Sequence, residues 1–276
     1  MAPVIEKPGS APSIALLLAA HGERRPDAGN TGAFQLARAL ASRSLVAEVA
    51  IGFISGTPGI KEALETLTAS RILVYPLFAS SGYFTRDRLV QLLDQAWGDG
   101  RSIDVLPPLG LDPGLPDLLC DQAVRCARDH GFAPEDCTFV LLAHGSKRNP
   151  ASRQATEQVA REIETRAACR KIVVAFLEEQ PSLEEAAASI RGPAIVLGLF
   201  SGEGLHGAKD APKLVARLGR RDIVFAGIMG SGPGIEDLVA RAVVAVLQDS
   251  GAVQVAGPPN QSTLAAAPVC WAVSVD

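Results

Sequence analysis

The sequence lacks the features that mark secreted, disulfide-linked or membrane-spanning proteins. Its five cysteines form no Cys-x-x-Cys pair, and their odd number argues against a disulfide framework. The apolar run IALLLAA at residues 14–20 is too short to span a bilayer, and no cluster of Lys or Arg precedes it as in a secretory signal. We therefore expect a cytoplasmic protein with ordinary thiols and no membrane partner.

An excess of positive charge is also absent. The chain has 26 Lys and Arg residues against 30 Asp and Glu, a formal net charge of −4, and no long basic run. Because binding to a nucleic-acid backbone depends on positive charge, we expect no nucleic-acid partner. The chain does have 276 residues of which 47% are apolar, and this is enough to bury a substantial core.

Short apolar runs alternate with longer amphipathic stretches along most of the chain. This alternation is typical of βα units around a parallel sheet that helices cover on both faces, so it predicts the α/β class. The expected strands are 14–20, 46–53, 71–78, 102–107, 138–143, 171–177, 193–200 and 222–228, and the expected helices are 29–42, 58–69, 85–97, 114–129, 151–167, 182–190, 209–218 and 234–248.

The second half of the chain repeats the first. His21 corresponds to His144 at an offset of 123 residues (144 − 21), and GFISGTPGIKEA at 52–63 corresponds to AFLEEQPSLEEA at 175–186 with the same offset. PLFASSGYF and GLFSGEGLH, which begin at residues 76 and 198, correspond at an offset of 122 (198 − 76). We therefore expect a tandem duplication of about 120 residues, with a parallel four-stranded sheet in each copy.

The repeat also suggests domain boundaries. We place the two repeated domains at 13–132 and 137–250. Residues 1–12 are Pro-rich and are expected to be a flexible N-terminus. Residues 251–276 are a tail that begins as a Gly/Pro/Ala linker and ends in PVCWAVSVD, which is apolar enough to dock somewhere.

Positions that differ between the two copies indicate what the fold alone does not require. The histidine after the first strand is present in both copies, but Glu178 after the second strand of the second copy corresponds to Ser55, and His206 after the third strand corresponds to Phe84. A single histidine after an apolar strand is more often a hydrogen-bonded structural residue than a ligand, and we assign that role to His21.

His144, Glu178 and His206 each follow the end of an expected strand, and in parallel α/β sheets reactive groups collect at the carboxyl ends of the strands. If the strands are neighbours, the three side chains converge at one edge of the sheet. Two imidazoles and a carboxylate that leave coordination positions open suit a divalent first-row metal such as cobalt, iron or nickel. The second copy therefore carries the candidate metal site.

Three motifs give the sequence a family resemblance. LLAHGS at 141–146, AFLEEQPSLEEA at 175–186 and LFSGEGLHGAKDAP at 199–212 resemble the class II chelatases of cobalamin and siroheme biosynthesis, most closely the sirohydrochlorin cobaltochelatase family in its long form with two fused halves. One departure is GLF at 198–200, where the family more often has PLF; we interpret it as drift.

The resemblance implies a fold and an activity. It implies two chelatase-like domains with a cleft between them, in which cobalt is inserted into sirohydrochlorin without ATP. His144 and His206 would bind the metal and accept the pyrrole protons, and Glu178 would assist. The divalent metal would be a substrate, no organic cofactor would be needed, and the first half would carry a degenerate site. The chain would act as a monomer or a weak homodimer.

The eight carboxylates of sirohydrochlorin would need cationic or N–H partners. Ser146, Lys147 and Arg148 follow His144 at the start of the next expected helix, where free N–H groups and the helix dipole favour anions, and Lys209 follows His206. These four residues are the candidate substrate-binding residues, although each charged one could equally be a solvated surface side chain.

Other functions stay open. Nothing in the three-residue site selects cobalt over iron or nickel, so a sirohydrochlorin ferrochelatase or a nickel chelatase is an alternative. A non-catalytic carrier of metal or tetrapyrrole on the same fold is a further one. The segment GLDPGLPD at 110–117 and its counterpart GSGPGIED at 230–237 could cradle an anion, but we interpret them as repeated turns before a helix.

Overall fold

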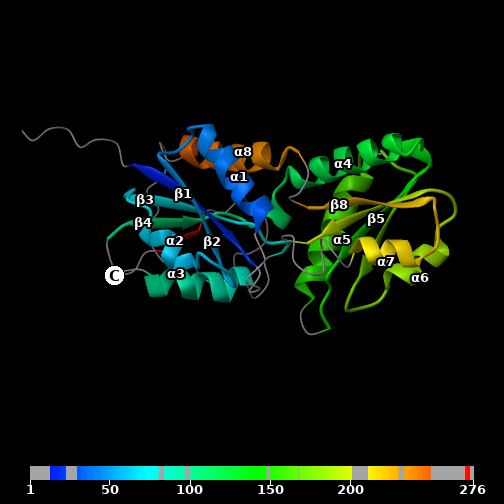
Figure 1. The fold of residues 1–276 in the computed structure, drawn as a ribbon, viewed down its shortest axis with the longest axis horizontal. Helices are drawn as coiled ribbons and strands as arrows, with labels where there is room; N and C mark the ends of the chain where they lie inside the picture. Colours follow the sequence, from blue (N-terminus) through cyan, green and yellow to red (C-terminus); the bar gives the residue numbers. More distant parts are fainter. Residues whose placement is uncertain are drawn as a thin grey trace, which may run out of the picture.

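The protein consists of two parallel β-sheets arranged side by side, each covered by helices on both faces (Figure 1). The computed structural model describes residues 13–22, 30–80, 84–96, 100–147, 150–166, 168–200, 211–229, 233–249 and 271–273. The expected α/β class, with a parallel four-stranded sheet in each half, is confirmed.

The two sheets have the same strand order. The first contains β1 (Ile14–Ala20), β2 (Glu48–Phe53), β3 (Arg71–Pro76) and β4 (Ser102–Val105) in the order β2-β1-β3-β4. The second contains β5 (Thr138–Ala143), β6 (Lys171–Phe176), β7 (Ala194–Leu199) and β8 (Ile223–Ile228) in the order β6-β5-β7-β8. Identical topology in two halves of the chain is what a tandem duplication predicts.

The first sheet carries one strand that the sequence pattern did not predict. Strand β9 (Trp271–Val273), from the tail, pairs antiparallel with β4, so that Val273 lies opposite Ile103. The first sheet therefore has five strands. The terminal apolar segment docks on an edge strand, whose unpaired N–H and C=O groups are available for such pairing.

Each face of each sheet has its own helices. The helices are α1 (Thr31–Ser42), α2 (Ile60–Glu65), α3 (Val90–Ala96), α4 (Leu115–Asp129), α5 (Ala151–Glu164), α6 (Leu183–Ser189), α7 (Ala211–Arg217) and α8 (Ile235–Asp249), with a π-helical turn η1 (Phe84–Leu89) and 3₁₀ turns η2 (Leu109–Leu111) and η3 (Pro134–Asp136). Helices α2 and α3 pack on one face of the first sheet, and α6 and α7 pack on the corresponding face of the second.

Strand β5 shows why the strands read as unbroken apolar runs. All six of its residues are buried. Phe139 and Leu141 pack with α4 and α5 on one face, whereas Val140 and Leu142 pack with α6 and α7 on the other, because successive side chains of a strand alternate between faces.

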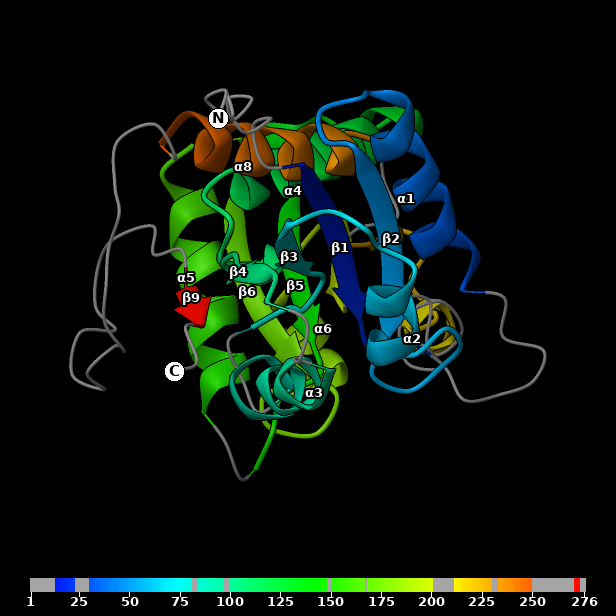
Figure 2. The ribbon, with the colours of Figure 1, turned by 90° about the vertical axis from the view of Figure 1, so that its left-hand side faces the viewer.

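The last helix of each half packs against the other half of the chain. Helix α4 packs against α5, β7 and β8 of the second half, and the Gln122 amide donates to the Ala226 carbonyl at 2.8 Å. Helix α8 returns to the first half and packs against α1, where Arg43 pairs with Asp237 at 2.6 Å. In Figure 1 α8 lies above the first sheet and α4 above the second, and Figure 2 shows both helices along the same side of the molecule.

This exchange makes the core continuous. Leu119 and Ala123 of α4, both fully buried, belong to the same apolar cluster as Leu16 of β1 and Val239 of α8. The predicted boundaries at 132 and 137 follow the sequence repeat, but packing does not stop there, because each terminal helix covers the other half. Among the described residues, no helix is both long and apolar enough to cross a membrane.

Gly198 explains one departure from the family pattern. A Cβ atom at this position would lie 2.8 Å from Cδ2 of Phe200 and 2.9 Å from Cγ2 of Ile228, and the pairing of β7 with β8 shifts register between Val196 and Gly198. Gly198 therefore lets the Phe200 ring and Ile228 approach the backbone, so the residue has a packing role in this structure.

Candidate active site

The strand order places at one edge the carboxyl ends of the three strands that precede the predicted site residues of the second half. Strand β5 lies between β6 and β7, and the ladder ends level, with Ala143 opposite both Phe176 and Leu199. The chain leaves β5 in one direction toward β6 and returns across it to β7, so the direction of winding reverses at β5. Such a reversal opens a crevice outside the carboxyl ends of the strands. The expectation that the three strands are neighbours is confirmed.

His144 and Glu178 meet at this edge. Nδ1 of His144 lies 3.8 Å from Oε1 of Glu178, and the two side chains are 44% and 59% exposed. The backbone continues the pairing of β5 with β6, because the Glu178 N–H donates to the His144 carbonyl at 3.0 Å. An accessible imidazole beside an accessible carboxylate can bind a divalent cation or accept a proton.

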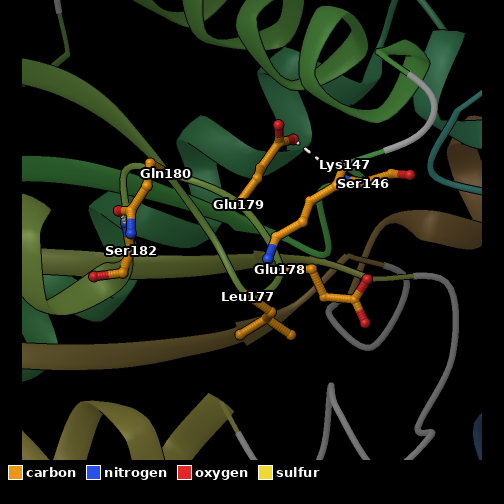
Figure 3. A pocket seen from close by; sticks show the side chains of 7 residues that line it. All are labelled: Ser146, Lys147, Leu177, Glu178, Glu179, Gln180 and Ser182. Atoms are coloured by element: carbon orange, nitrogen blue, oxygen red, sulfur yellow. Dashed lines mark hydrogen bonds between the residues drawn. The ribbon is translucent and has the colours of Figure 1, made fainter.

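A pocket lies next to Glu178. It has a volume of about 860 Å³ and is open to solvent. Figure 3 shows its seven lining residues, which come from the loop after β5 and the loop between β6 and α6: Ser146, Lys147, Leu177, Glu178, Glu179, Gln180 and Ser182.

The loop between β6 and α6 is fixed at its far end by a capping box. The Ser182 hydroxyl accepts from the Glu185 N–H at 3.2 Å, and the Glu185 carboxylate accepts from the Ser182 N–H at 2.9 Å. These two bonds satisfy N–H groups that the first turn of α6 would otherwise leave unpaired. With β6 at one end and the cap at the other, the segment that carries Glu178 is short and held at both ends.

Two of the candidate substrate-binding residues line this pocket, but in a different setting from the predicted one. Ser146 and Lys147 lie in a loop, since α5 begins only at Ala151. The Ser146 N–H donates to Oε1 of Glu179 at 3.2 Å, so the prediction of a free N–H at this position was wrong. Lys147 is exposed at the pocket, as expected of a residue that meets a carboxylate ligand.

Three of the predicted residues lie outside the described residues: Arg148, His206 and Lys209. In the described part of the chain, no group of three or more His, Cys, Asp and Glu side chains is arranged to hold a metal ion. The three-residue metal site therefore stays a prediction, of which the structure places His144 and Glu178.

The corresponding edge of the first half has the same backbone and different side chains. The Ser55 N–H donates to the His21 carbonyl at 2.7 Å, just as Glu178 does to His144. Ser55 offers a hydroxyl where Glu178 offers a carboxylate, so the histidine of the first half lacks this acidic neighbour.

Glu179 and Arg153 are prominent in the structure and were missed by the sequence analysis. The Glu179 side chain is 15% exposed, and its Oε2 lies 3.1 Å from a terminal nitrogen of Arg153. The Arg153 guanidinium carbon lies 4.4 Å from the centre of the Phe176 ring. A comparison of the two halves could have identified them, because the corresponding residues of the first half are different: Gly56 and Asn30.

Gly145 gives a direct test of this packing. Its φ is +73°, and a Cβ there would lie 2.7 Å from Cγ of Glu179. Gly192 has a φ of +82° with no atom within 4 Å of such a Cβ. We expect Gly145→Ala to lower the free energy of unfolding by more than Gly192→Ala does. Both variants place Ala in the left-handed region, which costs about 1–2 kcal/mol, but only Gly145→Ala also displaces Glu179. Urea denaturation of both variants measures the difference, and equal losses would show that Glu179 moves aside without cost.

The motif GLDPGLPD in the first half is a turn, as expected. Oδ1 of Asp112 accepts from the Gly114 N–H at 2.9 Å, and Oδ2 accepts from the Tyr75 hydroxyl at 2.9 Å. Burial raises the pKa of Asp112, while these two hydrogen bonds act in the opposite direction. Because both carboxylate oxygens are engaged within the protein, this segment is built as a helix start. Residues 230–232 of its counterpart lie outside the described residues.

The fold and the site together define a class of protein: a duplicated parallel α/β chain with a histidine and a carboxylate at the strand ends of one copy. The model of the CbiX family matches residues 15–126 and 138–246, one segment in each half. The chain belongs to the CbiX family.

Individual relatives agree with this membership. A probable sirohydrochlorin cobaltochelatase of Halobacterium salinarum is 23% identical over 260 residues, which cover 82% of this chain and 89% of that protein. The solved structure of CbiX, described as the terminal enzyme for biosynthesis of siroheme in denitrifying bacteria, is 25% identical with a TM-score of 0.67, over 84% of this chain and 98% of that one. SirB from Bacillus subtilis with Fe3+ shares the fold at 17% identity, with a TM-score of 0.71 over 87% and 97% of the two chains.

Proposed function

We propose that this protein is a sirohydrochlorin chelatase that inserts divalent cobalt into the macrocycle without ATP. Membership of the CbiX family supports the reaction, and the Halobacterium relative, named a probable sirohydrochlorin cobaltochelatase, supports the metal. The observation that carries the proposal is the pair His144 and Glu178, 3.8 Å apart at the carboxyl edge of the second sheet and absent from the first.

The chemistry explains why these residue types are needed. Insertion replaces two pyrrole N–H protons of the macrocycle with one divalent ion, so two protons leave for each metal that enters. Neutral imidazole can bind the ion or accept a proton near neutral pH, and we assign both roles to His144 and His206. The Glu178 carboxylate offsets the charge of the ion or passes protons to solvent, and at 59% exposure it can reach both.

The pocket beside Glu178 suits the acidic rim of the macrocycle. Lys147 contributes a cation at the pocket, and the Ser146 hydroxyl contributes a donor even though its N–H is engaged by Glu179. We assign carboxylate binding to these two residues together with Arg148 and Lys209.

The two halves have unequal roles in this proposal. The C-terminal domain, residues 137–250, carries the single active site, and the N-terminal domain, residues 13–132, forms the other wall of the cleft with a degenerate site. The protein would act in the cytoplasm as a monomer or a weak homodimer, with the metal as a substrate and without an organic cofactor.

Iron is the principal alternative metal. The relative from denitrifying bacteria is described as an enzyme of siroheme biosynthesis, and siroheme contains iron. Imidazole and carboxylate ligands accept cobalt, iron and nickel alike, so the pair His144 and Glu178 is compatible with any of the three.

Insertion assays with Co2+, Fe2+ and Ni2+ under anaerobic conditions test the proposal. We expect the protein to accelerate insertion into sirohydrochlorin above the spontaneous rate for each ion, with the largest kcat/KM for Co2+, measured from the change in absorption of the macrocycle. A larger value for Fe2+ would move the assignment to siroheme formation. Tight stoichiometric binding of metal or macrocycle without turnover would indicate a carrier.

A further inference from the structure

We propose that Glu179 and Arg153 form a positioning pair that holds His144 and Glu178 together. Neither residue touches the reacting atoms in this proposal. The predicted effects on the rate of metal insertion rest on the proposed chelatase function, whereas the predicted effect on amide exchange at Ser146 does not.

Glu179 joins the two loops that carry the site. Its Oε1 accepts from the Ser146 N–H at 3.2 Å, which ties the loop after β6 to the loop after β5. His144 lies two residues before Ser146, and Glu178 lies one residue before Glu179. In Figure 3 the side chains of Glu178 and Glu179 point in different directions, and the dashed line joins Glu179 to Ser146. The bond between the loops therefore fixes the spacing of His144 and Glu178.

Arg153 fixes Glu179 in turn. Its Nε donates to Oε2 of Glu179 at 3.2 Å, a terminal nitrogen donates to the Gln180 carbonyl, and the guanidinium lies over the ring of Phe176. With Oε1 and Oε2 both engaged and the side chain only 15% exposed, Glu179 is less suited than Glu178 to act as a ligand or a base. The adjacent and more exposed Glu178 carries that chemistry.

The location of Arg153 is costly for its helix. It is the third residue of α5, whose first turn contains no acidic residue, and a cation there opposes the helix dipole. Glu157, one turn later, lies 3.5 Å from another terminal nitrogen of Arg153 and offsets part of that cost. Arg153 opposes the dipole of its own helix but contacts Glu179, Gln180 and Phe176, so we explain its location by the loop that it holds in place.

The first half shows that the fold does not need the pair. Its loop between β2 and α2 follows the same path, since the Phe53 N–H donates to the Pro58 carbonyl at 2.9 Å as Phe176 does to Pro181. Gly56 and Asn30 occupy the positions of Glu179 and Arg153 there. The pair is present only in the half that carries Glu178, so we connect it with the site and not with folding.

The double change Glu179→Gly with Arg153→Asn tests this by giving the second half the residues of the first. We expect the variant to fold, with a Tm close to that of the wild type. The Ser146 amide should exchange with deuterium at least tenfold faster, because its acceptor is gone. The kcat for metal insertion should fall about 10- to 100-fold, with the KM for sirohydrochlorin changed less than about threefold.

Single variants separate positioning from a structural role. Glu179→Gly and Arg153→Asn should each lose most of what the double variant loses, because the two side chains act as one unit. Arg153→Lys should recover part of the rate that Arg153→Asn loses, since Lys keeps the charge without the two-pronged contact. Glu184→Gln, a change of an exposed carboxylate on α6, is the matched control and should retain wild-type kcat and exchange.

Each contrary result has a definite meaning. Wild-type kcat in the double variant would overturn the positioning pair and leave the chelatase proposal standing. A loss of rate that follows a matching loss of Tm across the variants would also overturn it, in favour of a purely structural pair. If the wild-type protein shows no turnover, the chelatase proposal fails. Independently of that result, an unchanged exchange rate of the Ser146 amide in the double variant would overturn the bridge between the loops.

Discussion

Replacement of His144 by Ala is expected to lower the kcat for metal insertion into sirohydrochlorin by at least 100-fold, whereas replacement of His21 is expected to change it less than about threefold. General acid–base catalysis by a positioned histidine contributes roughly 10²- to 10⁴-fold, and in the proposed function His144 would combine that role with metal binding. His21 has the same place on its strand but faces Ser55 and not a glutamate. The measurement is the initial rate of metallation at saturating cobalt and macrocycle.

The two variants control for each other. Both histidines follow the first strand of their half, an interior strand of its sheet, and each carbonyl accepts the same backbone hydrogen bond from the next loop, so a general effect on folding should affect both alike. Circular dichroism should show both variants folded. Equal loss of rate in the two variants would refute the assignment of the active site to the second half, and loss only in His21→Ala would move the site to the first.

Replacement of Leu119 by Ala is expected to destabilise the whole molecule by about 2–5 kcal/mol. Truncating a buried leucine removes its transfer free energy and leaves a cavity that the surroundings fill only in part. Leu119 is fully buried in the continuous cluster that includes residues of both sheets. Because α4 belongs to the first half in sequence and packs on the second, we expect both halves to unfold together at a lower urea concentration.

Leu111 supplies the control for this experiment. It is 46% exposed and lies in the 3₁₀ turn just before α4, so Leu111→Ala should change the free energy of unfolding by no more than about 0.5 kcal/mol. Two separate unfolding transitions, with only one shifted by Leu119→Ala, would contradict a core shared through α4 and α8.

Local patterns determined much of the fold. A strand that is buried on both faces leaves an unbroken apolar run in the sequence, such as TFVLLA in β5. The helices between the strands carry one apolar face each, so their order and approximate positions also followed from spacing, although α2 (Ile60–Glu65) is shorter than the predicted 58–69. Since parallel strands place their carboxyl ends at a common edge, the meeting of His144 with Glu178 could be predicted without coordinates.

Side-chain and tail contacts could not be predicted in this way. The sequence indicated a charged segment, LEEQ, but not that Glu178 stays accessible while Glu179 turns inward to Ser146 and Arg153. It indicated an apolar tail end, but not that β9 would pair with β4. These contacts depend on which polar groups elsewhere in the chain are left without a hydrogen-bond partner, and a local sequence pattern cannot show this.

By itself the sequence determined the α/β class and the duplication, and it assigned the candidate site to the second half, because burial periodicity and the comparison of two copies are properties of the chain alone. Only the tertiary structure decided that α4 and α8 each cover the opposite half, through contacts such as that of Gln122 with Ala226, 104 residues away. An amphipathic helix shows that it needs an apolar partner but not which of two similar sheets will supply it. Here that choice joins the halves into one core and sets the frame on which His144 and Glu178 are held.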